Sequence, residues 1–153
     1  MKITGAELAM LRARQKAPRP APTGAWLPGR RGLRLFVPGA LRNPLNRKPG
    51  WQDERRYRAR WKEGIASALL GLGYWRGALG SPALRKHVAF TAHVYHRFDG
   101  DGLQAALKAV RDGLRECGLI DDDRDSAGHL FEYRPQVVDR ARPGVEVEVR
   151  VEC

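Results

Sequence analysis

Apolar residues recur at two periods along the chain, and these periods predict most of its regular structure. A period of two, typical of strands with one buried face, runs over residues 86–98 and 145–152. Shorter apolar runs at residues 33–37 and 130–138 predict two further strands. The alternating positions expected to face the core are Val88, Phe90, Ala92, Val94, Val145, Val147, Val149 and Val151.

Two segments carry the helical period instead, residues 52–72 and 101–117. The apolar face of the first helix is predicted to contain Tyr57, Trp61, Ile65, Ala68, Leu69 and Leu72. On the second helix, Leu103, Leu107, Val110 and Leu114 form the apolar stripe, opposite a polar stripe of Asp101, Lys108 and Asp112. Asp101 and Gln104 have the spacing of a capping box, so a helix N-cap is the alternative to a metal-binding role for Asp101.

The resulting order of elements, β-α-β-α-β-β, predicts an α+β fold. We expect a single mixed or antiparallel sheet of about four strands, with two helices packed on one face. Residues 1–31 contain prolines at positions 18, 20, 22 and 28 and are expected to form a flexible basic arm, with a short basic helix over residues 5–16. Residues 32–153 are expected to form the folded domain.

The composition is that of one globular domain. The chain has 153 residues, of which 42% are hydrophobic and 29% charged, and no apolar run reaches the length of a membrane span. The first residues lack the apolar core of a secretory signal. Cys117 and Cys153 form neither a disulfide framework nor a CxxC pair. These features predict a cytoplasmic protein.

Charge is distributed unevenly along the chain, and this predicts a polyanionic partner. The net charge is +11, and residues 1–62 carry 16 basic and 3 acidic residues, whereas residues 63–153 carry 12 and 14. Of the 28 basic residues 22 are arginine, whose planar fork binds phosphate in a bidentate way. Nucleic acid is the favoured partner, and a solvated basic surface is the alternative. The candidate DNA-binding residues are Arg47, Lys48, Arg55, Arg58 and Lys62.

Acidic residues gather at two places in this basic protein. Asp99 and Asp101 follow a predicted strand, and an extended backbone places their Cα atoms about 7 Å apart on one face. Such paired carboxylates suit Mg²⁺ or Mn²⁺. Asp121, Asp122 and Asp123 follow the next helix, and spacing alone does not decide whether this turn returns to the first pair. The alternative is that these aspartates only cap helices and face solvent.

Other site classes fail on spacing. An EF-hand counted from Asp99 has Leu103 at its fifth position and Val110 at its twelfth, where oxygen ligands are required. The four histidines and Cys117 do not form an HExxH or paired-cysteine zinc motif. The sequence also contains no GxSxG, Walker or dinucleotide-binding motif.

The stretch FDGDGLQAALKAVRDGLRECGLIDDD, residues 98–123, resembles the RusA family of Holliday junction resolvases, especially its phage-borne members. Their pattern is D-x-D-N-L, a lysine and a further aspartate in the following helix, and then a G-hydrophobic-x-D-D turn. The matching residues are Asp99, Asp101, Leu103, Lys108, Asp112, Gly118, Asp122 and Asp123, with Asn46, Trp51, Arg58, Arg60 and Trp61 upstream. Gly102 stands where the family has asparagine. The resemblance extends over residues 33–152.

This resemblance implies a homodimeric, Mg²⁺-dependent endodeoxyribonuclease that resolves four-way DNA junctions by paired nicks in recombination and repair, with Mn²⁺ as an alternative metal. It implies that each subunit holds the metal with Asp99, Asp101, Asp122 and Asp123. Lys108 would contact the phosphate, and Asp112 and Asp121 would support the site. The alternatives are a non-catalytic nucleic-acid-binding protein, or a nuclease of the same fold that acts on other branched DNA.

Overall fold

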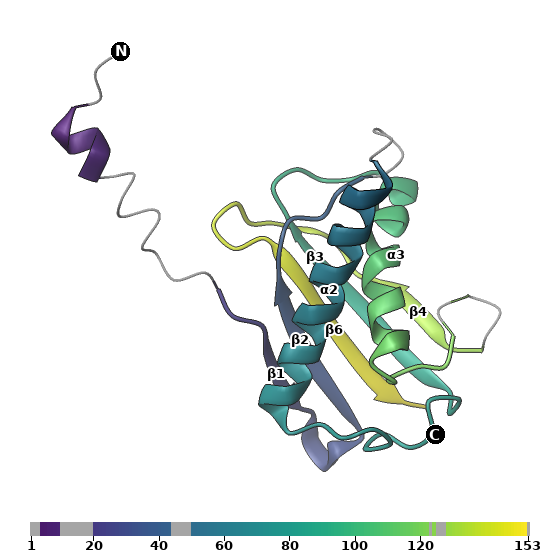
Figure 1. Cartoon of the computed structure of the whole chain (residues 1–153). Helices are drawn as coiled ribbons and strands as arrows, with labels where there is room; N and C mark the ends of the chain where they lie inside the picture. The colour runs from purple at the N-terminus through teal and green to yellow at the C-terminus, as the bar shows by residue number, and fades with distance from the viewer. Residues whose placement is uncertain (1–3, 10–19, 44–49, 123, 125–127, 153) are drawn as a thin grey trace.

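The computed structural model describes residues 4–9, 20–43, 50–122, 124 and 128–152, and these form an α+β fold with one mixed sheet and two long helices (Figure 1). The helices are α2 (Trp51–Leu72) and α3 (Gly100–Glu116). The sheet contains β1 (Thr23–Trp26), β2 (Gly32–Pro38), β3 (Lys86–Val94), β4 (Leu130–Tyr133), β5 (Val137–Val138) and β6 (Gly144–Val151), and a 3-10 turn η1 (Pro28–Arg30) joins β1 to β2.

The strands lie in the order β1-β2-β6-β3-β4, and β5 also pairs with β3. β6 is antiparallel to both β2 and β3, whereas β4 and β5 run parallel to β3. Both long helices cover the same face of this sheet (Figure 1). The predicted layers are therefore confirmed, but the sheet has six strands rather than about four.

One additional strand comes from the segment predicted to be an arm. Thr23–Trp26 pairs antiparallel with β2 and the turn η1 connects the two strands, so residues 23–31 belong to the folded domain and the predicted arm extends too far. The residues of β1 show no apolar alternation, because the position that faces α2 is a glycine. A Cβ on Gly24 would lie 3.1 Å from the Ala68 carbonyl oxygen, so α2 packs closely against this strand. An edge strand also tolerates the flanking prolines, since one side of its backbone needs no strand partner.

The other additional strand arises because the predicted strand over residues 130–138 is interrupted. Pro135 has no N–H to donate to the sheet, and it separates β4 from β5. The predicted strand over residues 86–98 likewise ends at Val94, where the last β5 pairing is made. Residues 5–9 are helical and begin with a capping box, in which Glu7 N donates to Thr4 Oγ1 and Thr4 N donates to Glu7 Oε2. The remainder of the helix predicted over residues 5–16 lies outside the described residues.

The core lies between the sheet and the two helices, on the faces that the sequence predicts. The fully buried residues include Leu33, Leu35, Trp61, Ile65, Val88, Phe90, Leu107, Val110, Leu114, Val145, Val147 and Val149. The two helices approach closely at Gly113, where a Cβ would lie 2.8 Å from Ile65 Cδ1. Among the described residues, no helix combines the length and apolar character that a membrane span requires.

The connection from β3 through α3 to β4 decides where the acidic residues lie. Because β3 and β4 are parallel neighbours, α3 must carry the chain back from the end of β3 to its start. Seventeen helical residues span about 25 Å. The two acidic groups of the sequence therefore lie at opposite ends of α3.

Candidate functional site

Asp99 is the N-cap residue of α3. Its backbone is extended, and its Oδ1 accepts a hydrogen bond of 2.7 Å from the backbone N–H of Gly102. The alternative in which Asp101 caps this helix is wrong, because the helix begins at Gly100 and Asp101 already lies in its first turn. Asp101 is exposed, and because residues 100 and 101 are helical, the extended geometry predicted to place Asp99 and Asp101 on one face is not formed. A carboxylate has two oxygens, so a capping bond leaves Asp99 capacity to bind a cation.

Asn43 is a site residue that sequence reasoning misses. A Cβ built on Gly102 would lie 2.5 Å from Asp99 Oδ1 and 2.6 Å from Asn43 Nδ2, so a side chain at position 102 would displace these two polar groups. The loop after β2 thus brings an amide to the place beside Asp99 and Gly102. No local spacing signals this contact, because it depends on how β2 and β3 are placed in the sheet.

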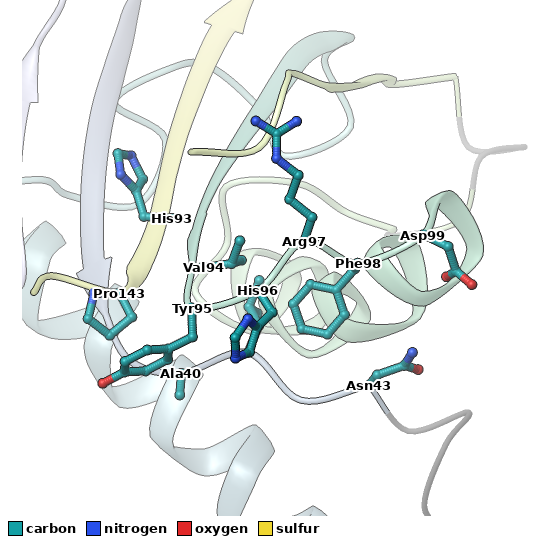
Figure 2. A pocket seen from close by; sticks show the side chains of 11 residues that line it. Ala40, Asn43, His93, Val94, Tyr95, His96, Arg97, Phe98, Asp99 and Pro143 are labelled. Carbon is teal, nitrogen blue, oxygen red and sulfur yellow. The ribbon is translucent and has the colours of Figure 1, made fainter. Parts of the chain in front are cut away.

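A recess of about 480 Å³ opens beside Asp99 (Figure 2). It is lined by Ala40, Leu41, Asn43, His93, Val94, Tyr95, His96, Arg97, Phe98, Asp99 and Pro143. Tyr95, His96 and Arg97 are exposed, so the recess combines aromatic, apolar and cationic groups next to a carboxylate. Its size and chemistry suit part of a nucleotide.

Gln136 fixes the segment that enters this site. Its Oε1 accepts from the backbone N–H of Phe98, and its Nε2 donates to the Phe98 carbonyl oxygen, both at 2.9 Å. This pair of bonds replaces the sheet pairing that ends at Val94. The backbone just before Asp99 is therefore held by a side chain from the β4–β5 region, which the sequence does not reveal.

The predicted polar stripe on α3 is only partly exposed. Lys108 is exposed two turns beyond Asp101, about 10 Å along the helix axis on the same side. Asp112 is instead buried, with 8% of its surface exposed, because it faces α2. There its Oδ2 lies 3.8 Å from the Arg58 guanidinium. Asp112 therefore joins the two helices and does not form one exposed row with Lys108.

The other acidic group lies at the start of β3. The backbone N–H of Asp121 donates to the Pro82 carbonyl oxygen at 3.1 Å, in the loop before that strand. Asp121 and Asp122 are thus separated from Asp99 and Asp101 by the length of α3. Within the described part of the chain, no three His, Cys, Asp or Glu side chains form a group that could hold a metal ion. Of the four predicted ligands, the chain therefore does not bring Asp122 together with Asp99 and Asp101, and Asp123 lies outside the described residues.

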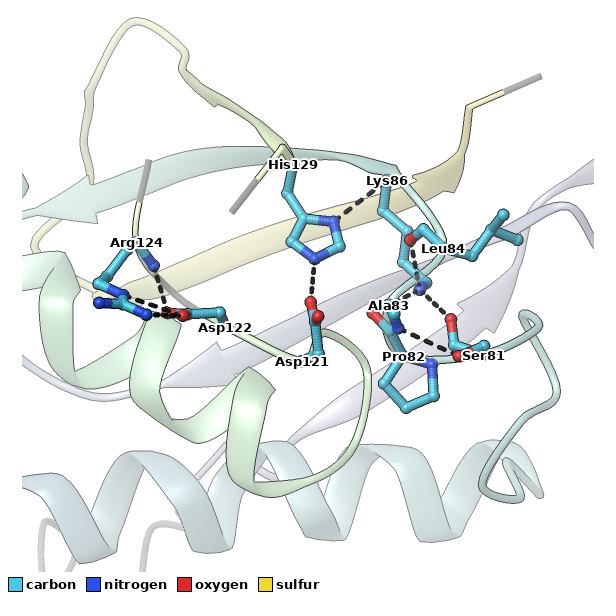
Figure 3. A network of polar contacts seen from close by, with 9 residues as sticks. All are labelled: Ser81, Pro82, Ala83, Leu84, Lys86, Asp121, Asp122, Arg124 and His129. Carbon is cyan, nitrogen blue, oxygen red and sulfur yellow. Dashed lines mark hydrogen bonds and ion pairs between the residues drawn. The ribbon is translucent and has the colours of Figure 1, made fainter. Parts of the chain in front are cut away.

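The two described carboxylates of this turn have different partners (Figure 3). Asp121 Oδ1 lies 2.6 Å from His129 Nε2, and this hydrogen bond is the main reason why the pKa of Asp121 is lowered. Asp122 Oδ2 accepts from Arg124 Nε and NH2 at 2.9 and 2.7 Å, and its Oδ1 accepts from Arg124 N. These hydrogen bonds from Arg124 lower the pKa of Asp122 to about 2. Both groups are therefore ionised near neutral pH.

The basic residues of α2 border a groove between the two helices. Arg58 pairs with Glu54 at 3.0 Å, and Lys62 pairs with Glu116 at 3.1 Å, so neighbouring carboxylates offset both of these predicted DNA-binding charges. Arg55 is exposed at this groove, beside Trp51, which is 70% exposed. Two other predicted DNA-binding residues, Arg47 and Lys48, lie outside the described residues.

The sheet face without helices carries a third charged group, centred on Glu148. This residue is 3% exposed and is bonded by Arg34, Arg134 and Arg150 at 3.0, 3.5 and 2.6 Å. Burial alone would raise the pKa of Glu148, but hydrogen bonds from the three arginines outweigh it and lower the pKa to about 2. The cluster joins β2 and β6 to the residue that follows β4, and it stabilises this face of the sheet.

Comparison of the chain with protein-family models gives no match, and neither does comparison with the curated proteins.

Proposed function

We propose that this protein is a Mg²⁺-dependent endonuclease that cleaves branched DNA, with the four-way junction as its substrate. The observation that carries this proposal is the group at the start of α3. There Asp99 caps the helix, Asp101 is exposed in its first turn, Lys108 lies on the same side of the helix as Asp101, and a recess of nucleotide size opens next to Asp99. The net charge of +11 and the resemblance to resolvases support DNA as the substrate.

The chemistry follows from the residues. Asp99 and Asp101 are hard oxygen ligands that suit Mg²⁺, which when bound polarises a phosphate and lowers the pKa of a water molecule. Lys108 contacts the phosphate and stabilises the negative charge that develops on it. Asn43, whose amide lies beside Asp99, is suited to hydrogen-bond either the carboxylate or the phosphate. The recess accepts the nucleotide next to the cleaved bond.

The third carboxylate of this site comes, in our proposal, from a second copy of the chain. Asp122 lies about 25 Å from Asp99 along α3, too far to share one cation. A two-fold dimer brings opposite ends of two such helices together when the helices run antiparallel. Each dimer would then hold two equivalent sites, as two symmetric nicks require.

The first test is cleavage of a labelled four-way junction, with Mg²⁺ or with EDTA, next to linear duplex of the same sequence. We expect paired nicks on the junction alone, and only with the metal. Tight binding without any cleavage in Mg²⁺ or Mn²⁺ would favour the alternative, a non-catalytic DNA-binding protein. That alternative has its own support, since Asp99 already serves as a helix cap.

A second test asks whether two subunits share each site. Asp99→Asn and Asp122→Asn proteins are each expected to be inactive, and mixed dimers of the two are expected to regain nicking. In such a mixed dimer, one site has lost both carboxylates and the other has both intact. If each site instead lay within one subunit, every site in the mixture would carry a substitution, and no activity would return.

A further inference from the structure

His129 is a fully buried side chain at the start of β4 whose two ring nitrogens are both engaged. The backbone N–H of Lys86 donates to Nδ1 at 3.2 Å. Nδ1 therefore accepts, and the ring proton is on Nε2, which donates to Asp121 Oδ1 at 2.6 Å (Figure 3). The contacts thus determine the tautomer of the imidazole.

This arrangement gives His129 a structural role rather than a role as general base. A general base needs a free ring nitrogen within reach of the substrate, whereas both nitrogens of His129 are used inside the protein. The imidazole instead connects the first residue of β3 to the carboxylate of Asp121.

Lys86, whose backbone N–H binds His129, is itself held by several hydrogen bonds. Lys86 is 1% exposed, and its Nζ donates to the carbonyl oxygens of Ser81, Pro82 and Leu84 at 2.9, 3.3 and 2.9 Å. The Pro82 carbonyl oxygen also accepts from Asp121 N. Both the backbone and the side chain of Asp121 are therefore attached to the start of β3, and Leu119 and Ile120 before it are buried.

We infer that His129 is a positioning residue: through Asp121 it fixes the acidic turn, so that Asp122 and not Asp121 is presented to the metal. This inference rests on the proposed function and deepens it, because the resemblance assigns Asp122 and Asp123 to the metal and Asp121 to a supporting role without giving a physical reason. The Nε2–H of His129 engages Asp121. Asp122 accepts three hydrogen bonds from Arg124, a side chain that is 76% exposed and can be displaced by a cation.

Two substitutions of His129 separate its two bonds. His129→Gln places an amide N–H near the position of Nε2 and keeps the donor to Asp121. His129→Asn places an oxygen near the position of Nδ1 and keeps only the bond from Lys86 N. We expect the Gln variant to retain junction nicking within about two-fold and the Asn variant to lose about ten-fold, the usual size of effect when a partner of a metal ligand is removed. The loss should appear in kcat and in the Mg²⁺ requirement rather than in KM for DNA.

Substitutions of Asp121 give the matched control. Asp121→Asn keeps an oxygen that accepts from His129, whereas Asp121→Ala does not. If Asp121 only positions the turn, Asp121→Asn retains its nicking activity. Asp121→Ala then loses activity to the same extent as His129→Asn. Equal inactivation of both variants would make Asp121 itself the ligand and overturn the inference. A drop in activity of His129→Asn that simply follows a lower melting temperature, with the Gln variant equally inactive, would also overturn it.

Binding of Mn²⁺ to the full-length protein, followed by electron paramagnetic resonance, separates this inference from the proposed function. We expect His129→Asn to weaken Mn²⁺ binding about ten-fold and His129→Gln to leave it nearly unchanged. If the wild-type protein binds Mn²⁺ but cleaves nothing, the proposed function fails and the ratio of these affinities still tests His129. Wild-type protein that binds no Mn²⁺ would overturn both.

Discussion

The two ends of α3 hold their carboxylates in different ways. At its start, Asp99 is held by a backbone N–H and Asp101 is exposed. At its far end, Asp121 and Asp122 are held by side chains, a buried histidine and an exposed arginine. The first end is preorganised by the helix itself, whereas the second depends on residues from β3, β4 and the loop between α3 and β4. Substitutions that preserve the fold should therefore affect the two ends to different degrees.

The largest expected effect comes from Asp99→Asn. Asparagine caps helices about as well as aspartate, so the free energy of unfolding should hardly change, whereas the ligand charge is lost. We expect cleavage to fall by about 10²–10³-fold, with junction binding retained or improved because a negative charge near phosphate is removed. Single-turnover cleavage and a binding titration measure the two quantities. Asp99→Ala is the control and should in addition lose about 1 kcal/mol of stability through the missing cap.

Acid titration distinguishes loss of the fold from loss of the site. Glu148 has its pKa lowered to about 2 in the folded protein, below the usual value of 4.5. It therefore stabilises the fold above pH 4.5, and this contribution is lost as the pH falls toward 2. The contribution is at most about 3 kcal/mol. Denaturant unfolding between pH 2 and 6 should show this loss in the wild type and a flatter profile in Glu148→Gln. Identical profiles would show that the three arginines do not act as described.

A smaller effect is expected where Arg124 contacts Asp122. The guanidinium occupies the carboxylate that our proposal assigns to the metal, so removing it should favour the cation. We expect Arg124→Ala to lower the Mg²⁺ concentration for half-maximal cleavage about three-fold, consistent with the modest energy of an exposed ion pair. The Mg²⁺ concentration for half-maximal cleavage by Arg124→Lys should lie between those of the wild type and Arg124→Ala. A higher Mg²⁺ requirement in Arg124→Ala would mean that the arginine assists the site.

The smallest effects concern the basic groove. Arg55→Ala should reduce the slope of log Kd against log salt concentration by about one, as expected for the loss of one phosphate contact. Arg58→Ala should change the slope less, because Glu54 and Asp112 already offset its charge. Its cost should appear instead as a loss of about 1 kcal/mol of stability or less. Equal slopes for the two variants would indicate that the ion pairs of Arg58 open when DNA binds.

Sequence periodicity predicted the parts of the fold that contain long regular patterns. Alternation over residues 86–98 and 145–152 located β3 and β6 with their buried faces, and the helical period located α2 and α3. β1 was not predicted, because four residues without apolar alternation carry no such signal. Asn43 and His129 could not be predicted as parts of a site, because their roles come from contacts between segments far apart in the sequence.

The two acidic groups illustrate the same limit. Their residue types and spacing were readable, but their separation depends on the direction of β4 relative to β3. Because β4 pairs parallel with β3, α3 returns the chain to the start of β3. No local sequence pattern indicates whether this pairing is parallel or antiparallel. The buried position of Asp112 has a similar origin, since it follows from where α2 packs and not from the helical period of α3.

The position of β6 has a consequence for biosynthesis. This strand is the last along the described chain, yet it lies between β2 and β3 and joins them. Until residues 144–151 have been synthesised, no strand pairs β2 with β3. The edges of β2 and β3 that later pair with β6 therefore remain unpaired in the nascent chain. Pairing of β2 with β6 also closes a loop of more than 100 residues, from Pro38 to Gly144. Such non-local pairing is slow, so the sheet forms late and only after synthesis of its central strand.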